Sequence, residues 1–61
     1  MAYSVRAGSD RFDFLTAVQA LERTRSLIDS GEPKVLMYDV AGEPMDLREL
    51  VLAAMLETRA T

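Results

Sequence analysis

The sequence predicts a small α+β domain with the element order ββαββα. Three observations lead to this fold class. Turn-forming glycines and prolines divide the 61 residues into short segments. Apolar residues alternate in some of these segments and recur at helical spacing in others. Helix-start signals precede both helical segments. We therefore expect two hairpins that form a small antiparallel sheet, one helix packed on that sheet, and a C-terminal helix, all within a single domain spanning residues 1–61.

The first hairpin is expected over residues 3–14, where apolar and polar residues alternate on both sides of Gly8. Alternation with a period of two is typical of strands that bury one side. A competing interpretation makes residues 9–15 the start of a helix, because Phe12–Leu15 could also form a first helical turn. The apolar side of the hairpin would hold Tyr3, Val5, Ala7, Phe12 and Phe14.

The first helix is predicted to begin at Thr16 and to end at Gly31. Thr16 and Gln19 form a capping box, in which each side chain accepts a hydrogen bond from the backbone of the other residue. Gly31 suits the left-handed residue that closes a helix, and Pro33 prevents the helix from resuming. The residues that recur at helical spacing and should face the core are Ala17, Ala20, Leu21, Thr24, Leu27 and Ile28.

The second hairpin is expected to begin with a central strand at Lys34–Val40. Hydrophobic residues on both of its sides favour a strand that is covered on two faces. Asp39–Gly42 fits a type I turn, followed by a bulge in which glycine adopts a positive φ. The returning strand, Glu43–Met45, is short, and Pro44 confines it to an edge or a bulge. This layout resembles that of short bacterial proteins with a hairpin, one helix and a second hairpin with a D-x-x-G turn; the resemblance implies no function.

The last helix is predicted to run from Leu47 to about Thr58, after a second capping signal formed by Asp46 and Glu49. It contains seven consecutive apolar residues, Leu50–Leu56, although a helix on a small domain needs only one apolar stripe. The surplus side chains should therefore contact a partner. The residues expected to carry this contact are Leu52, Met55, Leu56 and, from the second hairpin, Met37.

The small size of the chain also favours association. A single core of this size rarely supplies more than about 3–5 kcal/mol without disulfides, a metal or oligomerisation. The sequence contains no Cys, which excludes disulfides and thiolate zinc sites, and no His, which removes the commonest metal ligand. We therefore expect a homo-oligomer, most simply a dimer. A larger protein partner is the other form that such an association could take.

The composition argues against an enzyme. Without His or Cys, the serines lack the usual general base, and no cysteine nucleophile exists. Most of the ten carboxylates have structural roles as helix caps, turn residues or solvated groups. Asp39 and Glu43 are the nearest approach to a cation site, but calcium needs a denser string of oxygen ligands. We expect no catalytic residue, no metal site and no cofactor.

Nucleic acids and membranes are weaker candidates as partners. A net charge of −3 and a pI of about 4.7 disfavour attraction to phosphate. A small dimeric DNA-binding regulator is still the alternative hypothesis, and its contacts would come from Arg6, Arg11, Arg23 and Arg25. The N-terminus lacks a basic segment followed by an apolar run, and the longest apolar run is far short of the roughly 20 residues needed to cross a bilayer. We expect a cytoplasmic protein that does not bind membranes.

Overall fold

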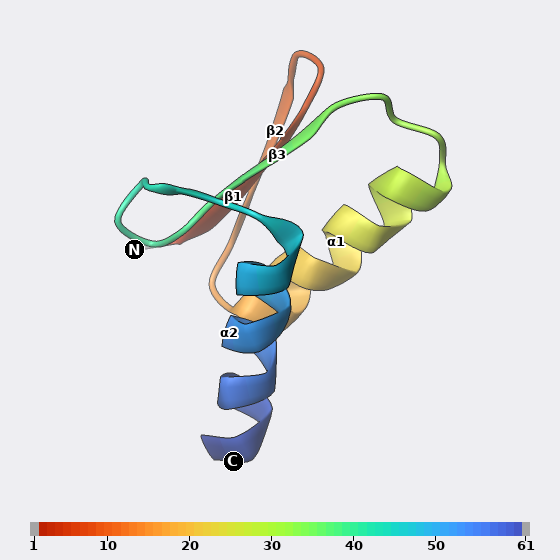
Figure 1. The fold of residues 1–61 in the computed structure, drawn as a ribbon. Helices are drawn as coiled ribbons and strands as arrows, with labels where there is room; N and C mark the ends of the chain where they lie inside the picture. Colours follow the sequence, from red (N-terminus) through yellow and green to blue (C-terminus); the bar gives the residue numbers. More distant parts are fainter. Residues whose placement is uncertain (1, 61) are drawn as a thin grey trace.

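The computed structural model, which describes residues 2–60, contains a four-stranded antiparallel sheet and two helices in the order ββαββα (Figure 1). The predicted fold class is confirmed. The strand order β2-β1-β3-β4 places the first strand of each hairpin in the centre of the sheet. The elements are β1 (Tyr3–Ala7), β2 (Asp10–Phe14), α1 (Ala17–Asp29), β3 (Val35–Tyr38), β4 (Pro44–Met45) and α2 (Leu47–Ala60).

The first hairpin forms as predicted, and the helical interpretation of residues 9–15 is wrong. Strand β2 pairs with β1 so that Val5 lies opposite Phe12. A two-residue turn joins the strands, with Gly8 at its first central position and a φ of 62°. A glycine with positive φ at this position is typical of the type II′ turn, whose twist matches that of the flanking strands. Pairing places both phenylalanines of β2 on the side of the sheet that faces the helices.

The turn of the second hairpin is organised by one aspartate. The backbone N–H of Gly42 donates to the carbonyl of Asp39 at 2.9 Å, and Gly42 has a φ of 83°. The Asp39 carboxylate accepts two further backbone N–H groups, from Ala41 and Glu43, each at 2.9 Å. The predicted turn and the short edge strand that contains Pro44 are both present.

The sheet is covered on one face only, which corrects the expectation for the second hairpin. Strand β3 is central, because it pairs with both β1 and β4. Both helices, however, lie on the same side of the sheet (Figure 1). Leu36 is consequently exposed, and Tyr38 is half-buried. The uncovered surface is called the open sheet face below; its residues are Ser4, Arg6, Arg11, Asp13, Leu36 and Tyr38.

The core lies where the two helices meet each other and the covered face of the sheet. Helix α1 contributes small side chains, so its backbone can approach closely. Thr24 is fully buried, and its hydroxyl donates to the carbonyl of Ala20 at 2.9 Å. Ile28, which was expected to face the core, is exposed because the last turn of α1 extends beyond α2 (Figure 1). The buried apolar cluster comprises Val5, Ala17, Ala20, Met37, Leu50 and Ala54.

Helix α1 ends at the predicted glycine. The backbone N–H of Gly31 donates to the carbonyl of Ile28 at 3.0 Å, and that of Glu32 donates to the carbonyl of Leu27 at 3.1 Å. Gly31 has a φ of 87°. This pair of bonds is the Schellman motif, which satisfies carbonyl groups that the helix end would otherwise leave unpaired.

Candidate interaction surface

Helix α2 begins with a complete capping box. The backbone N–H of Glu49 donates to Oδ1 of Asp46 at 2.8 Å, and the backbone N–H of Asp46 donates to Oε1 of Glu49 at 3.2 Å. The predicted start is therefore confirmed, and the helix continues to Ala60, slightly beyond its predicted end. The acidic side chain in the first turn also interacts favourably with the helix dipole.

The inward face of α2 is fixed by apolar and polar contacts with α1. Leu50 and Ala54 are 1% and 5% exposed. One turn further along, the carboxylate of Glu57 accepts hydrogen bonds from the backbone N–H groups of Ala17 at 2.6 Å and Val18 at 3.2 Å. Sequence reasoning did not assign Glu57 a role, because capping signals are sought within a few residues of a helix end.

The outward face of α2 carries three large apolar side chains. Leu52, Met55 and Leu56 are 53%, 55% and 64% exposed, and their helical positions lie opposite Leu50 and Ala54. We call these three residues the α2 patch. The helix therefore divides its apolar run between the core and the surface, as the sequence predicted for these three positions.

Met37 does not join the α2 patch. It lies on the covered face of β3 and is part of the buried core. In a strand, successive side chains point to opposite faces, so Met37 faces the helices while Leu36 faces away from them. The apolar residues on both sides of this strand did not indicate which side would be covered. Met37, which was expected among the contact residues, is therefore a core residue instead.

Leu15 is an exposed residue that sequence reasoning missed. It is 80% exposed and precedes by two residues Ala17, whose N–H binds Glu57. Leu15 therefore lies at the end of the molecule where α2 meets the start of α1. The sequence does contain a signal that could have predicted the exposure of Leu15. An apolar residue just before an N-cap normally packs on the fourth helical residue, but here that residue is Ala20, which is too small and too buried to offer a large contact.

The four arginines of the DNA-binding hypothesis do not form one surface. Arg6 and Arg11 lie opposite each other on β1 and β2, on the open sheet face. Arg23 lies on the covered side, with its guanidinium carbon 4.8 Å from the centre of the Phe12 ring. Arg25 lies on an exposed part of α1. Only the first two arginines are brought together.

Arg6 and Arg11 nevertheless make the open sheet face more positive than the chain as a whole. Arg6 and Lys34 line a depression of about 200 Å³. Asp13 is the acidic residue of this face, and its carboxylate accepts hydrogen bonds from the Ser4 hydroxyl at 3.0 Å and from Nε of Arg11 at 3.2 Å. The arginine–aspartate pair is largely solvated, so its contribution to stability is small.

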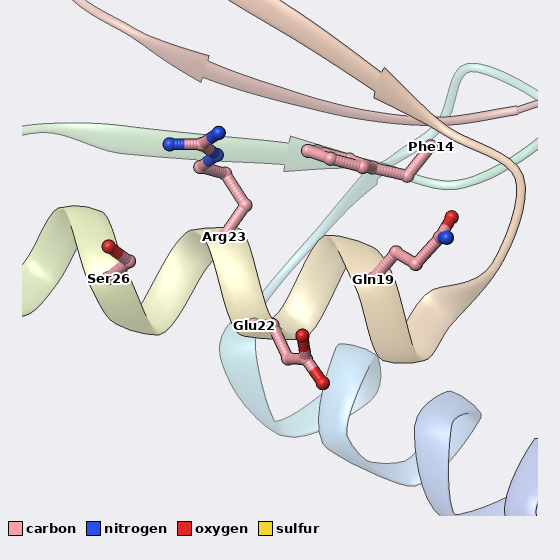
Figure 2. Close-up of a pocket in the computed structure, with 5 residues that line it drawn as sticks. All are labelled: Phe14, Gln19, Glu22, Arg23 and Ser26. Atoms are coloured by element: carbon pink, nitrogen blue, oxygen red, sulfur yellow. The ribbon is translucent and has the colours of Figure 1, made fainter.

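A groove of about 380 Å³ runs between the end of β2 and the exposed side of α1 (Figure 2). In this view Phe14 projects from the strand, Gln19 and Arg23 project from the helix toward it, and Glu22 points away. Four of the five lining residues are exposed, and Phe14 is half-buried. Sites for small molecules bury most of the surface of their ligand, whereas this lining is open to solvent. The groove therefore does not define a small-molecule site.

Two features are absent from residues 2–60, the part of the chain that the structure describes. No cluster of three or more acidic side chains is placed to hold a metal ion there. None of its helices has the length and apolar character needed to span a bilayer. The chain matches no protein-family model, no curated protein and no solved structure.

Proposed function

We propose that this protein is a non-catalytic protein–protein interaction module that associates with a second copy of itself through the α2 patch. The supporting observation concerns the exposed apolar side chains. Among the described residues, the four most exposed large apolar side chains are Leu15, Leu52, Met55 and Leu56. Three of them share one face of one helix, and the fourth lies near the end of that helix. Adjacent exposed apolar groups mark interaction surfaces more reliably than single ones.

The energetics support a reversible dimer. Complete burial of a leucine side chain contributes about 1.5–3 kcal/mol, so covering Leu52 and Leu56 on both copies gives a substantial driving force. A standard interface buries about 800 Å² on each partner, which is nearly a fifth of the 4457 Å² exposed by this chain. The α2 patch is smaller than such an interface. We therefore expect dissociation in the micromolar range.

Sedimentation velocity across a micromolar concentration series tests this proposal. The wild-type chain should form a dimer, and the double variant Leu52→Glu/Leu56→Glu should be a monomer with an unchanged helical circular dichroism spectrum. Ile28→Glu/Val40→Glu is the matched control, because it places two glutamates at exposed apolar positions outside α2. This control should still dimerise. A wild type that stays monomeric over the series, or a double variant that associates as the wild type does, would contradict the proposal.

The same surface could instead bind a larger protein, for which this chain would be an accessory subunit. In that case the wild-type chain would also be monomeric on its own. Sedimentation therefore separates the two forms of the proposal, and self-association is the form that we adopt because it needs no component other than this chain.

Nucleic-acid binding through the open sheet face is the second candidate. It is supported by the cross-strand position of Arg6 and Arg11, with Lys34 beside the same face. A gel shift with duplex DNA at low salt, repeated at rising salt, tests it, because binding to phosphate weakens steeply with salt. Binding that is lost in Arg6→Gln/Arg11→Gln would support this candidate. No shift at low salt would exclude it.

A further inference from the structure

We infer that two copies pair their α2 helices antiparallel about a twofold axis, with Glu49 of one copy beside the partner's Arg59. This inference rests on the proposed self-association and specifies its geometry. It follows from the order of residues along the exposed side of α2, together with the burial of the other side against α1.

The exposed side of α2 carries a seam of four residues at spacings of three, four and three. They are Glu49, Leu52, Leu56 and Arg59, and all four are exposed. This spacing is that of the positions at which two paired helices contact each other. Leu50 and Ala54, which are buried against α1, lie on the opposite side. The seam is therefore available for a second helix without any change in the fold.

The seam is complementary to itself when the second helix runs in the opposite direction. If the twofold axis crosses the helix pair at the level of residue 54, Leu52 lies opposite the partner's Leu56. The same axis places Glu49 opposite the partner's Arg59. A twofold interface repeats each contact, so the pair gains two leucine contacts and two ion pairs from one arrangement. The charges lie at the two ends of the apolar segment, where they border the contact without being buried in it.

A parallel pair would bring like charges together. Glu49 would then face the partner's Glu49, and Arg59 would face the partner's Arg59. Charges at the border of an interface select orientation more than they add affinity. The order acidic, apolar, apolar, basic therefore favours the antiparallel pair over the parallel one.

The capping role of Glu49 is compatible with this ion pair. Oε1 of Glu49 accepts the backbone N–H of Asp46 at 3.2 Å. A carboxylate has two oxygens and about four acceptor positions, so a guanidinium can bind the same group from outside. The capping box also restricts the rotation of the Glu49 side chain. Formation of the ion pair therefore costs less side-chain entropy than it would for a freely rotating glutamate.

A double-mutant cycle on the dissociation constant of the dimer tests the ion pair. The variants are Glu49→Gln, Arg59→Gln and the combination of both, since glutamine keeps a capping box while removing the charge. Two solvated ion pairs predict a loss of about fivefold for each single variant. The combined variant should be no weaker than either single one, and Lys34→Gln, which removes a distant charge, should leave the constant unchanged. Equal affinities throughout the cycle, or tighter binding by the single variants, would overturn the inference.

Cysteine cross-linking tests the orientation, and the absence of natural Cys keeps the background clean. An antiparallel pair separates the two copies of residue 59 by ten residues, which is about 15 Å along the helix axis. A disulfide needs Cα atoms within about 7 Å. Arg59→Cys should therefore form no disulfide with itself under mild oxidation, whereas a mixture of Leu52→Cys and Leu56→Cys chains should cross-link to each other.

The outcomes separate this inference from the proposal on which it rests. If the wild-type chain is a monomer, both fail. If it dimerises but Arg59→Cys cross-links to itself, self-association stands and the antiparallel arrangement is wrong. Cross-linking of the mixed chains together with coupling in the double-mutant cycle would establish both.

Discussion

The carboxylate of Glu57 accepts a hydrogen bond from the backbone N–H of Ala17 at 2.6 Å, across 40 residues of sequence. It also accepts the N–H of Val18 at 3.2 Å, while the hydroxyl of Thr16 accepts that of Gln19 at 3.2 Å. The first N–H groups of a helix have no partner within it, and its N-terminus attracts negative charge. The start of α1 is thus satisfied jointly by a local cap and by the other helix.

Replacing Glu57 with alanine should lower the free energy of unfolding by about 1–2 kcal/mol, because two backbone donors lose a charged acceptor. Urea denaturation followed by circular dichroism measures this difference. Glu22→Ala is the control, since Glu22 is an exposed glutamate on α1. That control should change stability by less than about 0.5 kcal/mol. Equal effects of the two substitutions would show that the hydrogen bonds from α1 contribute nothing.

Two leucines that are two residues apart in α2 should respond differently to truncation. Leu50 is 1% exposed, so Leu50→Ala should destabilise the fold by about 2–5 kcal/mol through lost burial and an added cavity. Leu52 is 53% exposed, so Leu52→Ala should change the stability of the monomer by less than about 0.5 kcal/mol. Thermal unfolding at low concentration, where dimers dissociate, measures both. A large loss in Leu52→Ala under those conditions would contradict the assigned orientation of α2.

The close approach of α1 to its neighbours depends on small side chains. Ala20 is 1% exposed, and a leucine there would force α1 away from the core at a cost of about 1–3 kcal/mol or more. Glu22→Leu is the control, because it places the same side chain at an exposed position of the same helix. It should leave the unfolding midpoint in urea nearly unchanged. A stable Ala20→Leu variant would mean that the core has room that the structure does not show.

Gly31 should be needed for its backbone conformation alone. Its φ is 87°, and a Cβ at this residue would meet no atom within 4 Å. Gly31→Ala should therefore destabilise the fold by about 1–2 kcal/mol, the cost of a left-handed conformation for an L-residue. A d-alanine at the same position, introduced by chemical synthesis, should equal or exceed the stability of the wild type because d-residues favour positive φ. If both alanines destabilise equally in thermal unfolding, crowding and not conformation would be the cause.

Local signals in the sequence predicted local structure well. The N-cap bond at Thr16, the capping box at Asp46, the turn at Asp39 and the helix end at Gly31 all depend on residues within a few positions of each other. The partners in these hydrogen bonds are close in sequence, so the signals for them can be recognised without knowledge of the tertiary structure. The alternation in β1 and β2 likewise predicted the hairpin and its apolar side, whereas the register of the two strands comes from the structure.

Long-range placement could not be predicted in the same way. The pattern of β3 shows apolar residues on both sides, but which side the helices cover depends on the direction in which the chain leaves each hairpin. Met37 and Leu36 were therefore not distinguished, although one is buried and the other exposed. The role of Glu57 was missed because its partners are 39 and 40 residues away. For the α2 patch, the surplus of apolar residues was visible in the sequence, whereas the exposure of Leu15 required the fold.

The reliance of α1 on Glu57 links the folding of this protein to the order of its synthesis. A ribosome produces the start of α1 long before it produces the residue that satisfies it. Until α2 emerges, the first turn of α1 keeps unpaired donors, and the small residues along its inner side lack the cover that Leu50 and Ala54 provide in the finished fold. Nascent α1 should therefore be frayed and only transiently helical. Stable structure should arise late and in one cooperative step, once α2 has left the exit tunnel.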